Sequence, residues 1–142
     1  MFAEMQVLYF TQRSAAQFVK FSGNPKPPAA VTARDVLEFA TVRGADCCAL
    51  SGTCGTLTPG KQADVVVLRA EDFRLNPVNN AIGAVVQNGR VGNVDTVFVA
   101  GRVRKWRGEL LGHDLRKIRA MADESRSYLF KASGWKLDVL GD

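Results

Sequence analysis

One histidine, His113, is followed directly by Asp114 and is the first candidate for chemistry in this chain. A histidine oriented by an aspartate can act as the general base for a serine or cysteine nucleophile. No such nucleophile is indicated near this pair. The pair also precedes a helical pattern, where an aspartate commonly caps the first turn. We therefore expect His113 to be a capping or solvent-facing residue.

The second candidates are the three cysteines, Cys47, Cys48 and Cys54. A reactive thiol needs a positive neighbour or a helix N-terminus, and Cys47 lies near an expected helix start. A structural zinc site needs about four nitrogen or sulfur ligands, and the single histidine is far away along the chain. The number of cysteines is odd and no secretory signal precedes them. We expect free, largely buried thiols in a reducing cytoplasm, with their role left open.

A third candidate is the stretch from Gly55 to Lys61, whose glycine and Gly-Lys spacing matches a phosphate-binding P-loop. However, Gln62 stands where that motif needs serine or threonine, and the run that follows is strand-like rather than helical. We reject this interpretation. The acidic residues of the region show no paired spacing: Asp64, Glu71, Asp72 and Asp95. The residues therefore predict no catalytic, cofactor-binding or metal-ligating position.

The N-terminal elements are expected to be helical. Residues 2–21 have apolar side chains at steps of three and four, over a face so broad that we expect burial on more than one side. Prolines make 22–31 a loop. Thr32 and Asp35 then resemble a capping box that starts a second helix. The expected bounds are 33–43 for that helix, with Gly44 as its C-cap, and 46–50 for a further helical turn.

From residue 51 the pattern changes to glycine-punctuated strands. Pro59-Gly60 predicts a turn before a β-branched run at 63–68, which reads as a strand covered on both faces. The runs 94–99 and 102–106 flank Ala100-Gly101 and predict a hairpin. Remaining segments are assigned as follows: loop at 70–80, strand or helical turn at 81–87, a continuation of the second hairpin arm at 109–111, a helix at 114–131 and a docking tail at 134–142.

Length and charge limit the function classes. A chain of 142 residues is one domain with at most a small appendage, and is too short for a (β/α)8 barrel of roughly 200–250 residues. The net charge of +5 is concentrated in residues 101–142, with ten basic and six acidic residues. Because those charges are interleaved, we expect a solvated helix face and no nucleic-acid site. Apolar runs long enough for a membrane span are absent from the sequence, and no signal peptide is visible.

Three sequence pieces resemble the C-terminal end of the metal-dependent amidohydrolase superfamily, in the branch of cytosine, guanine and S-adenosylhomocysteine deaminases and triazine chlorohydrolases. Residues 32–45 resemble T-x-x-[ED]-x-L-x-x-A-T-x-x-G-A, residues 55–68 resemble G-[ST]-[LI]-x-x-G-K-x-A-D-[LV]-[VI], and residues 94–103 resemble V-x-x-V-[FIW]-V-x-G-[RK]-x-V. Residues 1–5 are also similar to the start of the helix after the last barrel strand, so the resemblance covers almost the whole chain.

The resemblance implies an α+β chain that holds the last helices of a TIM-type barrel and the C-terminal half of a composite β-sandwich. It divides the chain into barrel helices at 1–50, a sandwich segment at 51–112 and a C-terminal helix and tail at 113–142. The family's zinc or iron ligands lie upstream of the equivalent of Met1, so the resemblance implies no cofactor in this chain. Such a metal lowers the pKa of its bound water for attack on an electrophilic carbon.

Two hypotheses follow. In the first, the chain is the structural C-terminal portion of a metal-dependent hydrolase of C–N or C–Cl bonds in ring or amide substrates, inactive alone. Its partners are then the N-terminal barrel portion or further copies of itself. In the second, it is a stand-alone α+β module that binds a protein or nucleic acid. Exposed apolar surface and unpaired strand edges favour association in either case.

Overall fold

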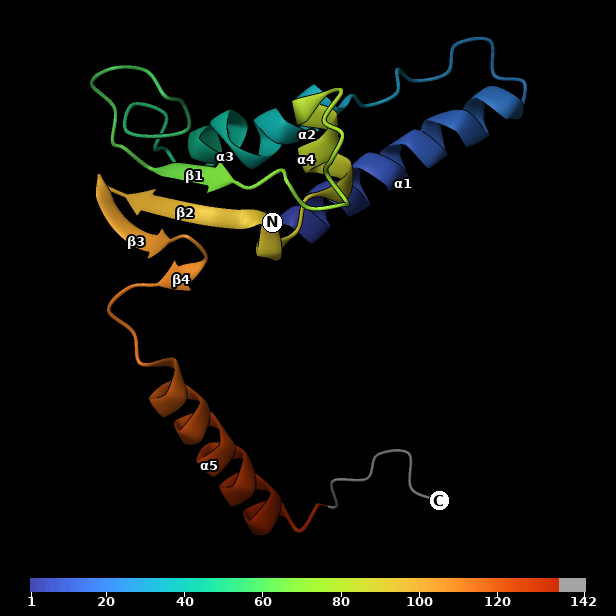
Figure 1. Ribbon diagram of the computed structural model, residues 1–142. Coiled ribbons are helices and arrows are strands. Elements are labelled where there is room, and N and C mark those ends of the chain that lie inside the picture. Colours follow the sequence, from blue (N-terminus) through green and yellow to red (C-terminus); the bar gives the residue numbers. More distant parts are fainter. Residues whose placement is uncertain (136–142) are drawn as a thin grey trace. The chain divides into compact units, whose positions relative to one another are not determined.

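An antiparallel sheet and the helices around it form the first of two structural units in the computed structural model, which describes residues 1–135 (Figure 1). The fold class is α+β, as predicted. Unit 1 covers Met1–Leu111 and unit 2 begins at Gly112. The expected segments 1–50, 51–112 and 113–142 stay predictions.

Helix α1 (Phe2–Phe21) has the predicted bounds but only one buried face. Phe2, Met5 and Ala16 are buried on the side that contacts helices α2 (Ala33–Ala40) and α4 (Ala81–Asn88). At about 100° per residue, a second apolar group projects from the other side of the helix. These side chains are exposed in this chain, so the expectation of burial on more than one side is wrong here: Val7, Phe10, Phe18 and Phe21.

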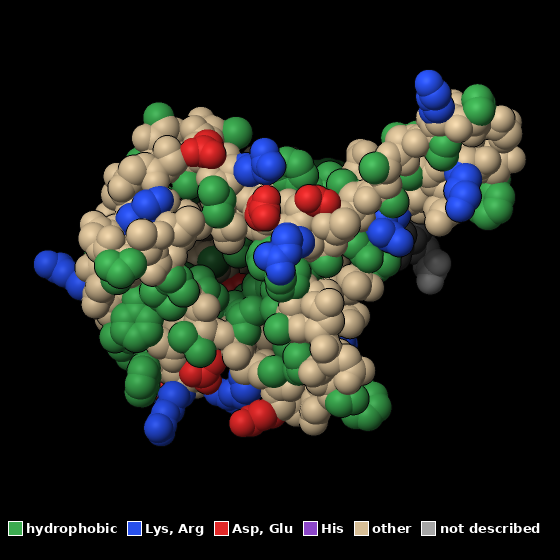
Figure 2. All heavy atoms as spheres, turned by 90° about the horizontal axis from the view of Figure 1, so that it is seen from above, with side chains coloured by type: hydrophobic (Ala, Val, Ile, Leu, Met, Phe, Trp, Pro, Cys, Tyr) green, Lys and Arg blue, Asp and Glu red, His purple; other side chains and the backbone are tan. Residues whose placement is uncertain are grey.

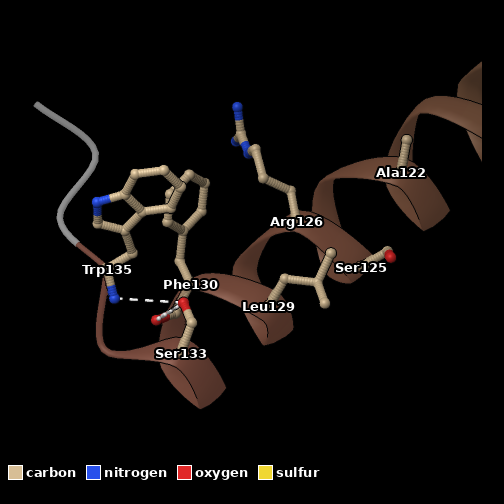
Figure 3. Close-up of a pocket in the computed structure, with 7 residues that line it drawn as sticks. All are labelled: Ala122, Ser125, Arg126, Leu129, Phe130, Ser133 and Trp135. Atoms are coloured by element: carbon tan, nitrogen blue, oxygen red, sulfur yellow. Dashed lines mark hydrogen bonds between the residues drawn. The ribbon is translucent and has the colours of Figure 1, made fainter. Parts of the chain in front are cut away.

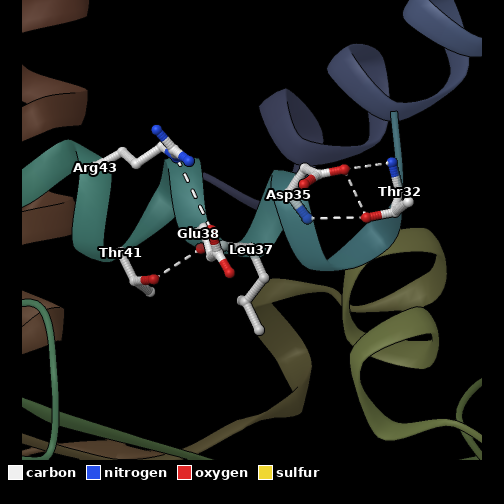
Figure 4. Close-up of polar contacts among 6 residues, drawn as sticks. All are labelled: Thr32, Asp35, Leu37, Glu38, Thr41 and Arg43. Carbon is white, nitrogen blue, oxygen red and sulfur yellow. Dashed lines mark hydrogen bonds and ion pairs between the residues drawn. The ribbon is translucent and has the colours of Figure 1, made fainter. Parts of the chain in front are cut away.

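Helix α2 (Ala33–Ala40) begins at the predicted capping box (Figure 4). The Asp35 amide donates to Thr32 Oγ1 at 3.2 Å, and the Thr32 amide donates to Asp35 Oδ2 at 2.8 Å. The predicted end at residue 43 is wrong. Thr41 leaves the helical conformation at φ −128° and ψ −88°, and α3 (Val42–Cys47) starts directly after it. Gly44 therefore lies inside α3 and caps nothing, and the helical turn expected at 46–50 lies earlier, within α3.

The sheet contains β1 (Val65–Leu68), β2 (Val94–Val99), β3 (Arg102–Trp106) and β4 (Glu109–Leu110), in that spatial order, with each pair antiparallel. The predicted hairpin is present, and its turn has positive φ at Ala100 (50°) and Gly101 (74°). The chain reverses again at Arg107 and Gly108, where φ is 47° and 89°. Residues 109–111 therefore do not continue the second arm as predicted, because β4 pairs back onto β3.

Strand β1 was expected to be covered on both faces, and this prediction is wrong for the chain as described. The Val66 and Val67 residues are 49% and 44% exposed, and neighbouring strand residues point to opposite faces. β1 also lies at an edge of the sheet. Both faces of this β-branched strand are thus partly open to solvent.

The core of unit 1 is a small cluster in which helices meet. Phe2 and Met5 of α1 pack with Val36 of α2 and Val86 of α4. Helix α4 (Ala81–Asn88) resolves the alternatives for residues 81–87 in favour of a helix. It starts where the Asn80 side chain accepts a hydrogen bond from the Gly83 amide at 2.9 Å. A 3-10 turn, η1 (Val91–Asn93), leads from α4 into β2.

Unit 2 contains helix α5 (Leu115–Ser133), two residues longer at its C-terminal end than predicted. Asp114 caps it by accepting hydrogen bonds from the Arg116 and Lys117 amides at 3.0 and 3.1 Å. No residue of α5 is buried. The tail predicted at 134–142 lies outside the described residues beyond Trp135. Among residues 1–135, no helix has the length and apolar character to cross a membrane.

Candidate functional site

The His113-Asp114 pair has a structural geometry rather than a catalytic one. His113 is exposed, as expected. Asp114 uses its carboxylate to accept two backbone amides at the start of α5. A carboxylate engaged in a helix cap in this way serves the helix rather than an imidazole.

Lys61, the lysine of the rejected P-loop, closes a loop through its own ammonium group. Its Nζ donates to the Ser51 carbonyl and, at 3.3 Å, to the Cys54 carbonyl. The turn before it has Gly60 at φ 90°, and the Lys61 amide donates to the Thr58 carbonyl at 3.2 Å, as the Pro-Gly pair predicts. The lysine charge is thus directed at peptide carbonyls in a loop that leads into β1, which supports the rejection.

Asp64 joins two of the sequence pieces that carry the family resemblance. Its Oδ1 accepts the Ala100 amide at 2.8 Å, and the Gly101 amide donates to the Ala63 carbonyl at 3.0 Å. The Ala100 amide, and secondly the Gln62 side chain, hold the pKa of Asp64 below its ordinary value. The Ala-Asp pair before β1 therefore fixes the turn between β2 and β3, 36 residues further on.

The buried Asn93 side chain links three segments and was missed by the sequence analysis. Its Nδ2 donates to Asp72 Oδ2 at 2.8 Å and to the Arg69 carbonyl at 3.4 Å, and its Oδ1 accepts the Arg90 amide at 2.9 Å. It is only 2% exposed. The Arg74 amide, followed by Asn93, lowers the pKa of Asp72. An asparagine between two valine-containing segments carries no periodic signal, so the sequence alone gave no indication of this role.

Asp95 on β2 forms an ion pair with Arg69, which follows β1. Thr96 Oγ1 also donates to Asp95 Oδ2 at 2.9 Å. These two donors, Arg69 first, lower the pKa of Asp95. The sequence spacing does not pair these acidic residues. In the fold, both lie near Arg69: its side chain pairs with Asp95, and its carbonyl accepts a hydrogen bond from Asn93, which also donates to Asp72. Each carboxylate has its own hydrogen-bond donors, so the arrangement stabilises the sheet edge rather than providing an acid–base pair.

The cysteines are more exposed than predicted. Cys47 and Cys48 are exposed and Cys54 is half-buried. They lie at the end of α3 and in the following loop, where little of the chain covers them. Within residues 1–135, His, Cys, Asp and Glu side chains form no group of three or more that could hold a metal ion. The donor set of the described residues therefore does not fit the zinc or iron ion of the family.

One hollow in each unit is mainly apolar. In unit 1, a cavity of about 240 Å³ has Asp64 and Thr41 as its polar wall residues, with the remaining wall formed by Met1, Phe2, Met5, Leu37, Ala40, Val66, Leu68 and Val85. In unit 2, a groove runs along α5, and Figure 3 shows Trp135 beside Phe130 at one end. Arg126 is the charged residue of that groove. Neither hollow brings together groups that could transfer a proton or attack a carbon atom.

The four-stranded antiparallel sheet, the helices packed beside it and the β2–β3 turn that Asp64 holds define an α+β unit. The chain belongs to the Amidohydrolase family, whose model matches residues 1–104. It is 37% identical over 101 residues to a 5-methylthioadenosine/S-adenosylhomocysteine deaminase of Teredinibacter turnerae, covering 71% of this chain and 21% of the relative. A 5'-deoxyadenosine deaminase of Methanococcus maripaludis is 35% identical, with 73% of this chain and 24% of the relative covered.

Solved structures agree in fold. An adenosine deaminase from Xanthomonas campestris with bound zinc superposes with a TM-score of 0.71 at 24% identity, over 87% of this chain and 28% of that one. A triazine hydrolase variant gives 0.71 at 21% identity, over 87% and 25%. The chain thus spans about a fifth to a quarter of the length of the curated relatives it matches. The resemblance stated from the sequence motifs is confirmed.

Proposed function

We propose that these residues form the C-terminal portion of a metal-dependent hydrolase of the deaminase type, and that their role is structural. In this proposal, residues 1–50 supply the last helices of a (β/α)8 barrel. Residues 51–112 supply half of a composite β-sandwich, and 113–142 supply a final helix and tail. The zinc or iron ion is held upstream, and the chain alone is inactive. The enzyme acts on C–N or C–Cl bonds of ring or amide substrates, and its similarity to deaminases favours deamination.

The observation that carries the proposal is the second apolar face of α1. Phe18 and Phe21 are 74% and 82% exposed although α1 is packed against α2 and α4 on its other side. A helix that is apolar on two sides is typical of a position between two layers of structure. The space-filling view shows hydrophobic side chains at the surface in several patches (Figure 2). Strand β1 adds a second exposed apolar surface, since Val66 and Val67 are partly exposed on opposite faces.

The alternative of a nucleic-acid-binding module is not favoured by the charges of α5. Arg126 pairs with Asp123 at 3.1 Å, so basic and acidic groups share this helix surface. A phosphate-binding surface would instead present unopposed basic groups. We propose a cytoplasmic location, because the three cysteines are free thiols in the structure and free thiols are typical of a reducing compartment.

The second face of α1 can be tested with the fluorescent dye ANS, which binds exposed apolar surface, and with sedimentation velocity. We expect the purified chain to bind ANS and to self-associate. Phe10→Ser combined with Phe18→Ser should reduce both, while the helical circular dichroism is retained. Phe73→Ser is the matched control, because Phe73 is 99% exposed but lies in a loop outside α1.

Equal dye binding and equal association in the double variant and in the wild-type chain would contradict the interface. A loss of the same size in the Phe73→Ser control would also contradict it, because the effect would then belong to exposed phenylalanines in general.

A further inference from the structure

Cys48 and Cys54 line the same cavity between α3 and the loop that follows it. The cavity has a volume of about 300 Å³, and Cys47 is not among its lining residues. Cys48 is exposed and Cys54 is half-buried. Two cysteines of one chain thus border one solvent-accessible space. The structural role proposed above uses neither of them.

The path of the backbone brings both cysteines to this cavity. The loop passes directly over α3, since a Cβ built on Gly55 would lie 2.8 Å from the Ala45 Cβ. Cys54 immediately precedes Gly55. Cys48 follows Ala45 by three residues and therefore lies on the same side of the helix, whereas Cys47 follows it by two and points away.

Two backbone hydrogen bonds hold the connection between the cysteines in a tight path. The Leu50 amide donates to the Ala45 carbonyl at 2.8 Å, and the Cys54 amide donates to the Leu50 carbonyl at 2.9 Å. Lys61 Nζ also donates to the Cys54 carbonyl at 3.3 Å. The backbone of Cys54 is thus fixed near the end of α3 by groups on both sides of the loop.

We propose that Cys48 and Cys54 form a dithiol pair that closes to an intramolecular disulfide by exchange with a small-molecule disulfide. The more exposed thiolate, Cys48, attacks one sulfur of the small disulfide. The S–S bond of that molecule breaks, a mixed disulfide forms, and one small thiolate leaves and takes up a proton. The Cys54 thiolate then attacks the Cys48 sulfur and displaces the second small thiolate.

The exchange balances. The two protein thiols lose two protons and two electrons, and the small disulfide gains them to become two thiols. A disulfide requires the two Cα atoms to lie within about 7 Å of each other. The shared cavity and the short loop between Cys48 and Cys54 favour such an approach.

The test uses the full chain, oxidised glutathione as the small disulfide, and peptide mass mapping after alkylation of the remaining thiols. We expect a Cys48–Cys54 crosslink as the main product, with Cys47 carrying only a reversible glutathione adduct. Cys54→Ser should abolish the crosslink and accumulate the adduct on Cys48. Cys47→Ser is the matched control and should close at the wild-type rate.

The native fold must select the pair, so the same reaction in concentrated urea should lose the preference for Cys48 over Cys47. A main crosslink between Cys47 and Cys48 or between Cys47 and Cys54 would overturn the proposal. Stable glutathione adducts on all three cysteines without a crosslink would overturn it as well.

Discussion

Asn93 shows how a single residue can hold several segments of this molecule together. Its side-chain amide forms hydrogen bonds with Asp72, the Arg69 carbonyl and the Arg90 backbone N–H. Its backbone carbonyl accepts a hydrogen bond from the Arg69 backbone N–H at 2.7 Å. Because the side chain is buried, each lost partner would leave a polar group without water to replace it. Asn93 therefore ties the segment after β1 to η1 through groups that water cannot replace.

We predict that Asn93→Ala lowers the free energy of unfolding by about 1–3 kcal/mol, since it leaves buried backbone and carboxylate groups without partners. Urea denaturation followed by circular dichroism measures the change. Asn79→Ala is the control, because Asn79 is an exposed loop residue. An effect of Asn93→Ala no greater than that of the control would show that the network does not stabilise the fold.

The acidic residues predict how stability depends on pH. Hydrogen bonds and the Arg69 ion pair lower the pKa values of Asp64, Asp72 and Asp95 in the folded chain. A carboxyl group whose pKa is lowered by folding stabilises the fold above its unfolded pKa, and this stabilisation is lost as the pH falls through the folded value. The free energy of unfolding should be level near neutral pH and fall below about pH 4.

Replacing these carboxylates should flatten that acid slope. In Asp95→Asn, the ion pair with Arg69 is lost at every pH, so the variant should be less stable at pH 7 and should lose less on acidification. Thermal unfolding midpoints between pH 7 and pH 3 measure both effects. A slope as steep as that of the wild-type chain would contradict the assignment of the acid sensitivity to Asp95.

The helices and turns that depend on residues close together in the sequence were predicted well. The capping box at Thr32, the Ala100-Gly101 hairpin and the periodicity of α1 are each decided by neighbouring residues. The break at Thr41 was missed. There the Thr41 hydroxyl donates to the Leu37 carbonyl at 2.8 Å, and such back-bonding favours a bend that no spacing rule marks.

The second hairpin and the polar links could not be read from the sequence for a different reason. The strand that follows Arg107-Gly108 has only two residues, Glu109 and Leu110, which is too short for an alternating strand pattern to mark it. The link between Asp64 and Ala100 joins residues 36 positions apart, and only the pairing of β1 with β2 brings them together. The family motifs contain both Asp64 and Ala100, but the spacing of the motifs does not predict the hydrogen bond between them.

The helical core predicts a clear packing effect. Val86 of α4 is fully buried among Phe2, Met5 and Val36. Val86→Ala removes two methyl groups and leaves a cavity, so we predict a loss of about 2 kcal/mol in the free energy of unfolding. Val91→Ala, at a residue that is 73% exposed, should change it by less than about 0.5 kcal/mol. Equal effects in chemical denaturation would show that this cluster is not the core.

At the scale of the whole molecule, much apolar surface lies outside the core. The buried apolar set is small, whereas phenylalanines of α1 and valines of β1 remain exposed. The relatives are four to five times longer than the matched part, so in them the equivalent surface has further chain available to cover it. Under the proposed function, the second face of α1 and both faces of β1 would pack against the remainder of a longer enzyme.

The most direct measurement is the metal content and deaminase activity of the chain. The purified chain is incubated with zinc or iron, desalted and analysed by mass spectrometry of the elements, and ammonia release is followed with 5'-deoxyadenosine and S-adenosylhomocysteine. The account predicts no stoichiometric metal after desalting and no ammonia. One tightly retained metal ion per chain together with ammonia release would contradict it, because the chain would then hold its own catalytic centre.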